Sequence, residues 1–168
     1  GKTIHAVSYD INSYGNPVQS TGGWSLEMMD PRMPCNMLNW RASTNNKGGT
    51  PGAENSIYKK FSVDNNLQAL QCTAINEKLL LLTLNQGADS SSLSMASHYQ
   101  LAGWSNAVLS ARALPPLFNS VEISLNQPLE TKRIYLLKAS PIKGCNSNTL
   151  DSLEVRTGLA KSPEAGDL

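Results

Sequence analysis

Charged side chains are scarce in this 168-residue sequence, at 16% of its residues, against about 25% in an average soluble domain. The 14 Lys and Arg residues nearly balance the 13 Asp and Glu residues, which leaves a net charge of +1. No electrostatic feature therefore points to nucleic acid or an anionic membrane as a partner. Long apolar runs are also absent. The longest, residues 79–82, is far shorter than the roughly 20 residues that span a bilayer, so we expect no membrane span in this fragment.

Residues that commonly bind metals are few. The chain has two histidines, His5 and His98, and its three cysteines are not at the C-x-x-C spacing of a zinc site. Two oxygen-rich segments, residues 10–12 and 64–66, hold too few carboxylates for the roughly six to eight oxygen ligands of calcium. We therefore expect neither a metal ion nor a cofactor.

The motifs of common enzyme classes are missing. Residues 103–107 (GWSNA) come closest to a G-x-S-x-G nucleophile elbow, but they lack the last glycine. A nucleophilic serine also needs a base and an orienting acid, and we interpret His98 as a surface side chain beside the core residue Trp104. Glu27 alternates with large apolar neighbours, so we expect its carboxylate to be solvated. These absences predict no catalytic residue and a protein that is not an enzyme.

Strand-like alternation is what the sequence has in abundance. Residues 24–28 (WSLEM) and 121–125 (VEISL) alternate apolar and polar side chains, as half-buried strands do. Residues 79–84 (LLLLTL) predict a strand that is buried on both faces. Further strands are expected at residues 3–9, 67–73, 104–113 and 132–139. Many short strands between Gly, Pro and Asn turns indicate an all-β sandwich.

One segment favours a helix instead. Residues 90–99 follow Asp89, a suitable N-cap, and place Leu93 and Ala96 three positions apart. We expect one or two helical turns there.

The composition changes along the chain and suggests four parts. Residues 1–57 are rich in turns, and residues 58–66 form a linker. Residues 67–150 hold enough strands for one Ig-like β-sandwich. Residues 151–168 end in a Pro, Gly and acidic stretch that is typical of a linker to a following module. The expected fold is thus an Ig-like β-sandwich with an additional loop-rich β segment at the N-terminus.

An ordered series of short elements runs through the N-terminal part. They are residues 22–27 (GGWSLE), 30–31 (DP), 39–40 (NW), Ser43 and 48–52 (GGTPG). In this order they resemble the C-terminal half of bacterial lamin-tail domains, as found in surface proteins of the Bacteroidetes group. The resemblance implies an Ig-like β-sandwich within a modular surface protein.

The rest of the chain resembles the bacterial Ig-like modules that often follow lamin-tail domains. The resemblance is carried by the strand at residues 79–84, the segment ADSSSLSMASHYQLAG and the closing PIKGCNSNTL. The last residues, VRTGLAKSPEAGDL, resemble the lead-in to another lamin-tail domain.

The Ig-like assignment also suggests a disulfide. The first and last strands of such a sandwich lie close together, so we expect Cys72 to pair with Cys145. The bridge would close a loop of about 70 residues and stabilise the fold by about 4 kcal/mol in the chain-entropy model. Cys35 would stay free, or pair with a part of its domain that this sequence lacks.

The sequence therefore predicts a non-catalytic fragment of a modular cell-surface or secreted protein with a structural, spacing or adhesion role. The protein would be exported to the cell surface, the periplasmic face or the extracellular space. Its partners would be neighbouring modules of the same chain, with a glycan or a surface protein as further candidates. The alternative is a carbohydrate-binding accessory module of a larger surface enzyme. In that case Trp40 and Tyr14, the aromatic residues that we place in loops, would stack on sugar rings.

Overall fold

The computed structural model describes residues 6–60, 67–144 and 149–160. The chain divides into two compact units, Gly1–Asn65 and Asn66–Leu168. We call them the N-terminal unit and the sandwich unit, and we describe each by itself.

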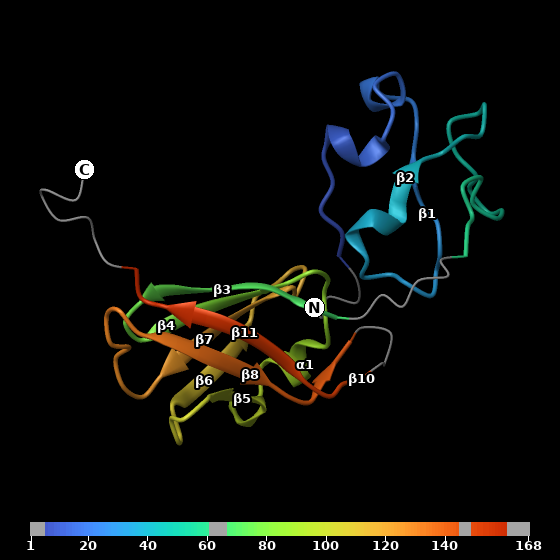
Figure 1. Ribbon diagram of the computed structural model, residues 1–168. Helices are drawn as coiled ribbons and strands as arrows, with labels where there is room; N and C mark the ends of the chain where they lie inside the picture. The colour runs from blue at the N-terminus through green and yellow to red at the C-terminus, as the bar shows by residue number, and fades with distance from the viewer. Residues whose placement is uncertain (1–5, 61–66, 145–148, 161–168) are drawn as a thin grey trace, which may run out of the picture. The chain divides into compact units, whose positions relative to one another are not determined.

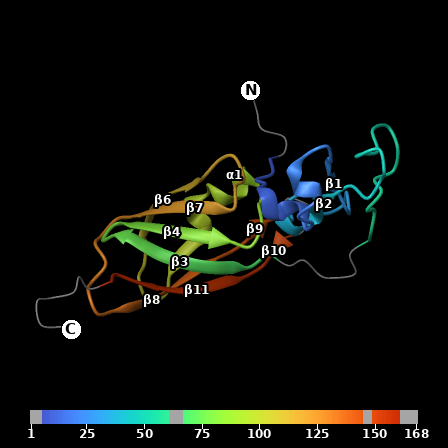
Figure 2. The same ribbon diagram turned by 90° about the horizontal axis from the view of Figure 1, so that it is seen from above.

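The sandwich unit contains two antiparallel sheets (Figures 1 and 2). The four-stranded sheet has the order β3-β4-β7-β6 and the three-stranded sheet the order β11-β8-β5. These are the strand orders A-B-E-D and G-F-C of a constant-type immunoglobulin sandwich. The predicted all-β fold class is confirmed. The strands are β3 (Ala69–Asn76), β4 (Leu79–Leu84), β5 (Tyr99–Leu101), β6 (Val108–Ala113), β7 (Ser120–Leu125), β8 (Ile134–Ala139) and β11 (Leu153–Gly158).

Shorter elements complete the sandwich unit. Helix α1 (Ser90–Leu93) and the 3-10 helix η4 (Ala96–His98) occupy the predicted helical segment. Asp89 caps α1, because its side chain accepts a hydrogen bond from the Ser92 amide at 2.7 Å. Strands β9 (Ile142–Lys143) and β10 (Thr149–Leu150) follow β8 and precede β11 in the sequence, and they pair with each other in antiparallel orientation.

Leucine side chains from alternate positions fill the space between the two sheets. Leu80, Leu82 and Leu84 of β4 are at most 2% exposed. Leu79 and Leu81 are only half-buried, so the predicted burial of residues 79–84 on both faces is wrong. Each fully buried leucine contributes about 1.5–3 kcal/mol of hydrophobic stabilisation.

A tyrosine at the start of β8 fixes the preceding loop. The Tyr135 hydroxyl accepts a hydrogen bond from the Glu130 amide at 2.9 Å, and the Tyr135 ring stacks on Trp104 at 5.5 Å between centroids. This arrangement corresponds to the tyrosine corner of immunoglobulin sandwiches. Leu137, two residues further on, is fully buried where antibody domains place a disulfide cysteine. Leu137 thus joins β8 to the core by hydrophobic packing.

The first and last strands of the sandwich unit, β3 and β11, lie side by side and run in the same direction (Figures 1 and 2). The chain consequently enters this unit at one end of the sandwich and leaves it at the other.

Both edge strands of the four-stranded sheet contain bulges. Leu70 and Ile75 on β3, and Leu109 on β6, fall where the register shifts, and each is more than half exposed. The Ala113 amide at the end of β6 donates to Ser94 Oγ at 3.1 Å. Bulges and occupied edge amides hinder pairing with a strand of another molecule.

The structure also corrects several boundaries in the sequence prediction. Strand β11 lies inside the segment 151–168 assigned to a linker, because Leu153 and Thr157 are buried in the sandwich. Strand β5 begins within the segment assigned to the helix. Residues 6–9 are not in a strand, and residues 3–5 of that predicted strand lie outside the described residues.

The N-terminal unit is mostly loop. Its described residues form one two-stranded antiparallel sheet of β1 (Leu26–Met28) and β2 (Trp40–Ala42). Three short 3-10 helices accompany it, namely η1 (Ile11–Tyr14), η2 (Gln19–Thr21) and η3 (Met37–Asn39). Such a small sheet cannot enclose an apolar core, so other interactions must hold this unit together.

Candidate functional site

The polar residues of the N-terminal sequence motif form a buried hydrogen-bond network. Glu27 is only 5% exposed, so its predicted solvation is wrong. One carboxylate oxygen accepts from Thr50 Oγ1 at 2.6 Å, and the other accepts from the amide and the hydroxyl of Ser56, both at 2.8 Å. A buried carboxylate with this many donors is satisfied without a counter-ion.

Hydrogen bonding also sets the protonation of Glu27. Burial raises the pKa of Glu27, but hydrogen bonds from Thr50, Ser56 and Ser43 outweigh it and hold the pKa below its ordinary value. The charged form is therefore the form that the fold stabilises, and Glu27 does not have the raised pKa that a general acid requires.

A second network surrounds the Asp30–Pro31 step. Asp30 and Asn39 are both fully buried. Asn39 Oδ1 accepts from the Asp30 amide at 2.8 Å, and Asn39 Nδ2 donates to the carbonyls of Asp30 and Met33 at 2.6 and 2.8 Å. The Arg32 guanidinium donates to both oxygens of the Asp30 carboxylate. The Asp-Pro and Asn-Trp elements of the motif are thus bound to each other through Asp30 and Asn39.

The glycines of the motif allow two backbone segments to approach closely. Gly48 has a φ of +83°, and a Cβ added to it would lie 2.1 Å from the carbonyl oxygen of Gly23. Ser25, next to this contact, donates its amide to the Gly48 carbonyl at 2.8 Å. No residue with a side chain fits at position 48 unless the backbone moves.

The mutation Gly48→Ala should lower the free energy of unfolding of the N-terminal unit by clearly more than Gly52→Ala. Gly52 also has a positive φ, +76°, but a Cβ there meets nothing within 4 Å. Gly52→Ala should therefore cost only the left-handed backbone penalty of about 1–2 kcal/mol. Denaturant unfolding followed by Trp24 and Trp40 fluorescence measures both. Equal losses would mean that the Gly23 carbonyl moves aside at no cost.

A groove of about 640 Å³ lies over the sheet of the N-terminal unit. Its apolar part consists of Leu26, Met28, Trp40 and Pro51, and Met28 and Trp40 are direct partners in the β1–β2 register. Leu26 and Met28 are half-buried, so the apolar face of β1 is not covered as the alternation predicted.

The two predicted stacking residues are not brought together in this groove. Trp40 lines it, but it belongs to β2 rather than to a loop. Tyr14 ends η1 and is not among the lining residues. Of the two residues, Trp40 is thus the one that contributes apolar surface to this groove, as stacking on a sugar ring requires.

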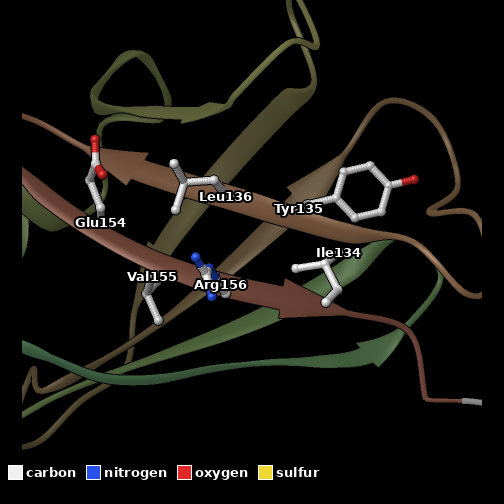
Figure 3. Close-up of a pocket in the computed structure, with 6 residues that line it drawn as sticks. All are labelled: Ile134, Tyr135, Leu136, Glu154, Val155 and Arg156. Atoms are coloured by element: carbon white, nitrogen blue, oxygen red, sulfur yellow. The ribbon is translucent and has the colours of Figure 1, made fainter.

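A second depression, of about 510 Å³, lies over β8 and β11 (Figure 3). Leu136 and Glu154 project to one side of the two strands, and Val155 projects to the other. The Glu154 carboxylate is engaged by Lys138 Nζ at 2.7 Å. This surface is an open sheet face with an exposed ion pair, and it lacks the convergent polar groups of a catalytic cleft.

His98 and Ser105 do not form a nucleophile–base pair among the described contacts. The Nδ1 atom of His98 lies 3.0 Å from the Ser92 carbonyl oxygen, and the His98 carbonyl accepts from the Ser140 amide. These contacts connect the end of α1 to η4, which is a structural role.

The cysteines differ from the prediction. Cys72 is a free thiol, so the predicted bridge from Cys72 is wrong; Cys145 lies outside the described residues. Cys72 is in register with Leu82 of the same sheet and points into the core, where it packs as a small apolar side chain. Cys35, predicted either to stay free or to pair with a part of its domain that this sequence lacks, is disulfide-bonded, so the free alternative is wrong.

Cys72 should resist alkylation in the native protein. Burial raises the pKa of the Cys72 thiol to about 11, although a hydrogen bond with Thr157 lowers it slightly. At pH 8 only about one thiol in a thousand would be the reactive thiolate. Peptide mapping after iodoacetamide treatment should show unmodified Cys72 in buffer and complete modification in guanidinium. Rapid labelling in buffer would contradict the buried position.

Two features are absent from the ranges that the structure describes, 6–60, 67–144 and 149–160. No three His, Cys, Asp or Glu side chains within them cluster so as to hold a metal ion. No helix within them is long and apolar enough to cross a membrane.

Comparison with known proteins finds a similar fold in solved structures but no similar sequence. No protein-family model matches the chain, and no curated sequence matches it. The fold is similar to the structure of surface layer protein SbsC, domains 1–6, with a TM-score of 0.51 at 13% identity. The crystal structure of S-layer protein rSbsC(31–844) gives the same values. The match covers 60% of this chain but only 14% of each of those chains. At this identity the likeness concerns the fold alone, and the lamin-tail resemblance stays a prediction.

Sequence reasoning missed the polar interior of the N-terminal unit. The alternation in residues 24–28 predicts a solvated Glu27, because the apolar residues of such a strand usually point inward. One signal in the sequence could have indicated it. Asp, Asn, Ser, Thr and Gly cluster around Trp24 and Trp40, and the side chains of Asp, Asn, Ser and Thr commonly form hydrogen bonds with backbone groups.

Proposed function

We propose that this chain is part of a non-catalytic, exported, modular protein of the cell surface, in which it serves as a structural or spacing unit. The observation that carries the proposal is the likeness of its fold to modules of a surface-layer protein. The disulfide on Cys35 supports export, since disulfides persist in oxidising compartments. Its partners would be the neighbouring modules of the same chain.

The contacts of the titratable side chains support a role without catalysis. The carboxylates of Glu27, Asp30 and Glu154 are each engaged in hydrogen bonds or ion pairs within the fold. His98 is likewise engaged, through its Nδ1 atom.

Labelling of cells of the source organism with an antibody against the chain tests the proposal. Intact cells should be labelled as strongly as permeabilised ones, and a cytoplasmic protein probed in parallel should be labelled only after permeabilisation. Labelling restricted to permeabilised cells would overturn the cell-surface assignment.

The groove over β1 and β2 favours a second candidate, a carbohydrate-binding accessory module of a larger surface enzyme. Trp40 presents an apolar ring in a groove that also contains the polar side chains of Lys47 and Asn55. A glycan array with the wild type, Trp40→Ala and Tyr14→Ala decides between the candidates. Binding that is lost with Trp40→Ala and kept with Tyr14→Ala would establish this candidate, and no binding by the wild type would favour the spacer.

A further inference from the structure

The first and last strands of the sandwich unit are arranged so that a force on the chain acts along both of them. Strand β3 begins at one end of the unit, β11 ends at the other, and the two strands run side by side in the same direction (Figures 1 and 2). We propose that the sandwich unit is a module that resists tension applied through these two strands. The inference rests on the proposed function, because a spacer between two modules is pulled from both sides.

The backbone pairing of each terminal strand resists such a force as a whole. Strand β3 has six residue pairs with its neighbour β4, and β11 has six with β8. The hydrogen bonds of an antiparallel pair lie perpendicular to the strands. A strand that is pulled along its own axis must slide past its neighbour, so all of these bonds are strained at the same time. A force across the strands would instead open the pairs one after another, starting at one end.

Buried side chains of the two strands add to this resistance. Cys72 of β3, and Leu153 and Thr157 of β11, are each at most 8% exposed. A sliding strand must pull such side chains out of their packing, and the close packing of a protein interior leaves them no room to move gradually. The two strands also pack against each other. Because they are pulled in opposite directions, this contact is sheared as well.

Resistance to tension is a different property from stability. Forced unfolding is governed by the rate of unfolding and not by the equilibrium free energy, and under force this rate depends on which contacts must break first. The same folded unit should therefore resist a force along its strands and yield to a force across them. A unit that is merely stable would not show this dependence on direction.

Single-molecule pulling of the full chain in two directions tests the proposal. Handles are attached through an azide-bearing amino acid that replaces two exposed residues, either Gln68 and Ala160 or Gln68 and Ser152. The first pair of handles lies before β3 and after β11, and it pulls along the strands. The second pair lies before β3 and before β11, at the same end of the unit, and it pulls across the strands. A reductant removes the Cys35 disulfide from the comparison.

The force along the strands should be several-fold higher than the force across them at the same loading rate. Both pairs of handles extend nearly the same stretch of chain, about 300 Å when unfolded, so the two unfolding forces can be compared directly. Equal thermal midpoints of the two labelled proteins and the wild type provide the control that the handles leave the fold intact. Equal forces in the two directions, or a lower force along the strands, would overturn the proposal. The labelling of intact cells tests the location separately, so a failure of the proposed function is distinguishable from a failure of this inference.

Discussion

Glu27→Ala is expected to lower the free energy of unfolding of the N-terminal unit by about 3 kcal/mol or more, the cost of leaving several buried donors without an acceptor. The donors are the hydroxyl of Thr50 and the amide and hydroxyl of Ser56. Glu27→Gln should cost less, because one carbonyl oxygen remains to accept. Guanidinium unfolding followed by tryptophan fluorescence measures both variants.

The exposed Glu54 provides the control for this experiment. Glu54→Ala removes the same charge from the same unit and should change its stability by less than about 0.5 kcal/mol. If Glu27→Ala and Glu54→Ala behave alike, the buried network does not stabilise the unit.

The lowered pKa of Glu27 also makes the free energy of unfolding of the N-terminal unit depend on pH. Since the folded-state pKa lies below the ordinary value of 4.5, the unfolded chain binds this proton more readily than the folded chain does. The resulting stabilisation is complete above about pH 4.5 and is lost as the pH falls toward the lowered folded-state pKa. The difference in free energy of unfolding between the wild type and Glu27→Gln, measured at each pH, isolates the contribution of the Glu27 carboxylate. A difference that does not change below pH 4.5 would contradict the lowered pKa.

Leu137→Ala should destabilise the sandwich unit by about 2–5 kcal/mol, the range for large-to-small changes in a well-packed core. Leu137 is fully buried between the sheets, in register with Val155 and Leu101. The adjacent Leu136 projects from the other face of β8 and is only half-buried. Leu136→Ala should therefore cost clearly less.

Thermal or guanidinium unfolding of the two leucine variants, followed by Trp104 fluorescence and circular dichroism, makes the comparison. The two variants remove the same atoms from neighbouring positions of one strand, so the difference isolates burial. Losses of equal size would mean that β8 does not face the core as the structure has it.

The sandwich unit could be predicted from the sequence because its interior is apolar. The alternation in residues 121–125 and the leucines of residues 79–84 mark β7 and β4 correctly, since period-two burial leaves a direct trace in sequence. Strand β11 was missed because it alternates around Glu154 and Arg156, whose charges resemble those of a linker. Its burial depends on β8, which lies far away in sequence.

The candidate sites could be predicted only in part, because their chemistry depends on distant partners. Trp40 was identified as a candidate ligand contact, and it does line a groove. Glu27 and Ser56 are 29 residues apart, and no local pattern shows that a serine amide will meet a carboxylate. The order of the motif residues can be read from the sequence, whereas the hydrogen bonds between them can be identified only in the folded structure.

The parallel course of β3 and β11 has a mechanical consequence for any longer polypeptide that contains the sandwich unit. Segments joined before β3 and after β11 depart from opposite ends of the unit. Each unit therefore lengthens the polypeptide by the extent of the sandwich along its strands. The eight residues of β3 span roughly 26 Å. A sandwich with both attachment points at one end would add almost nothing. The number of such units would then set the length that they add to the polypeptide.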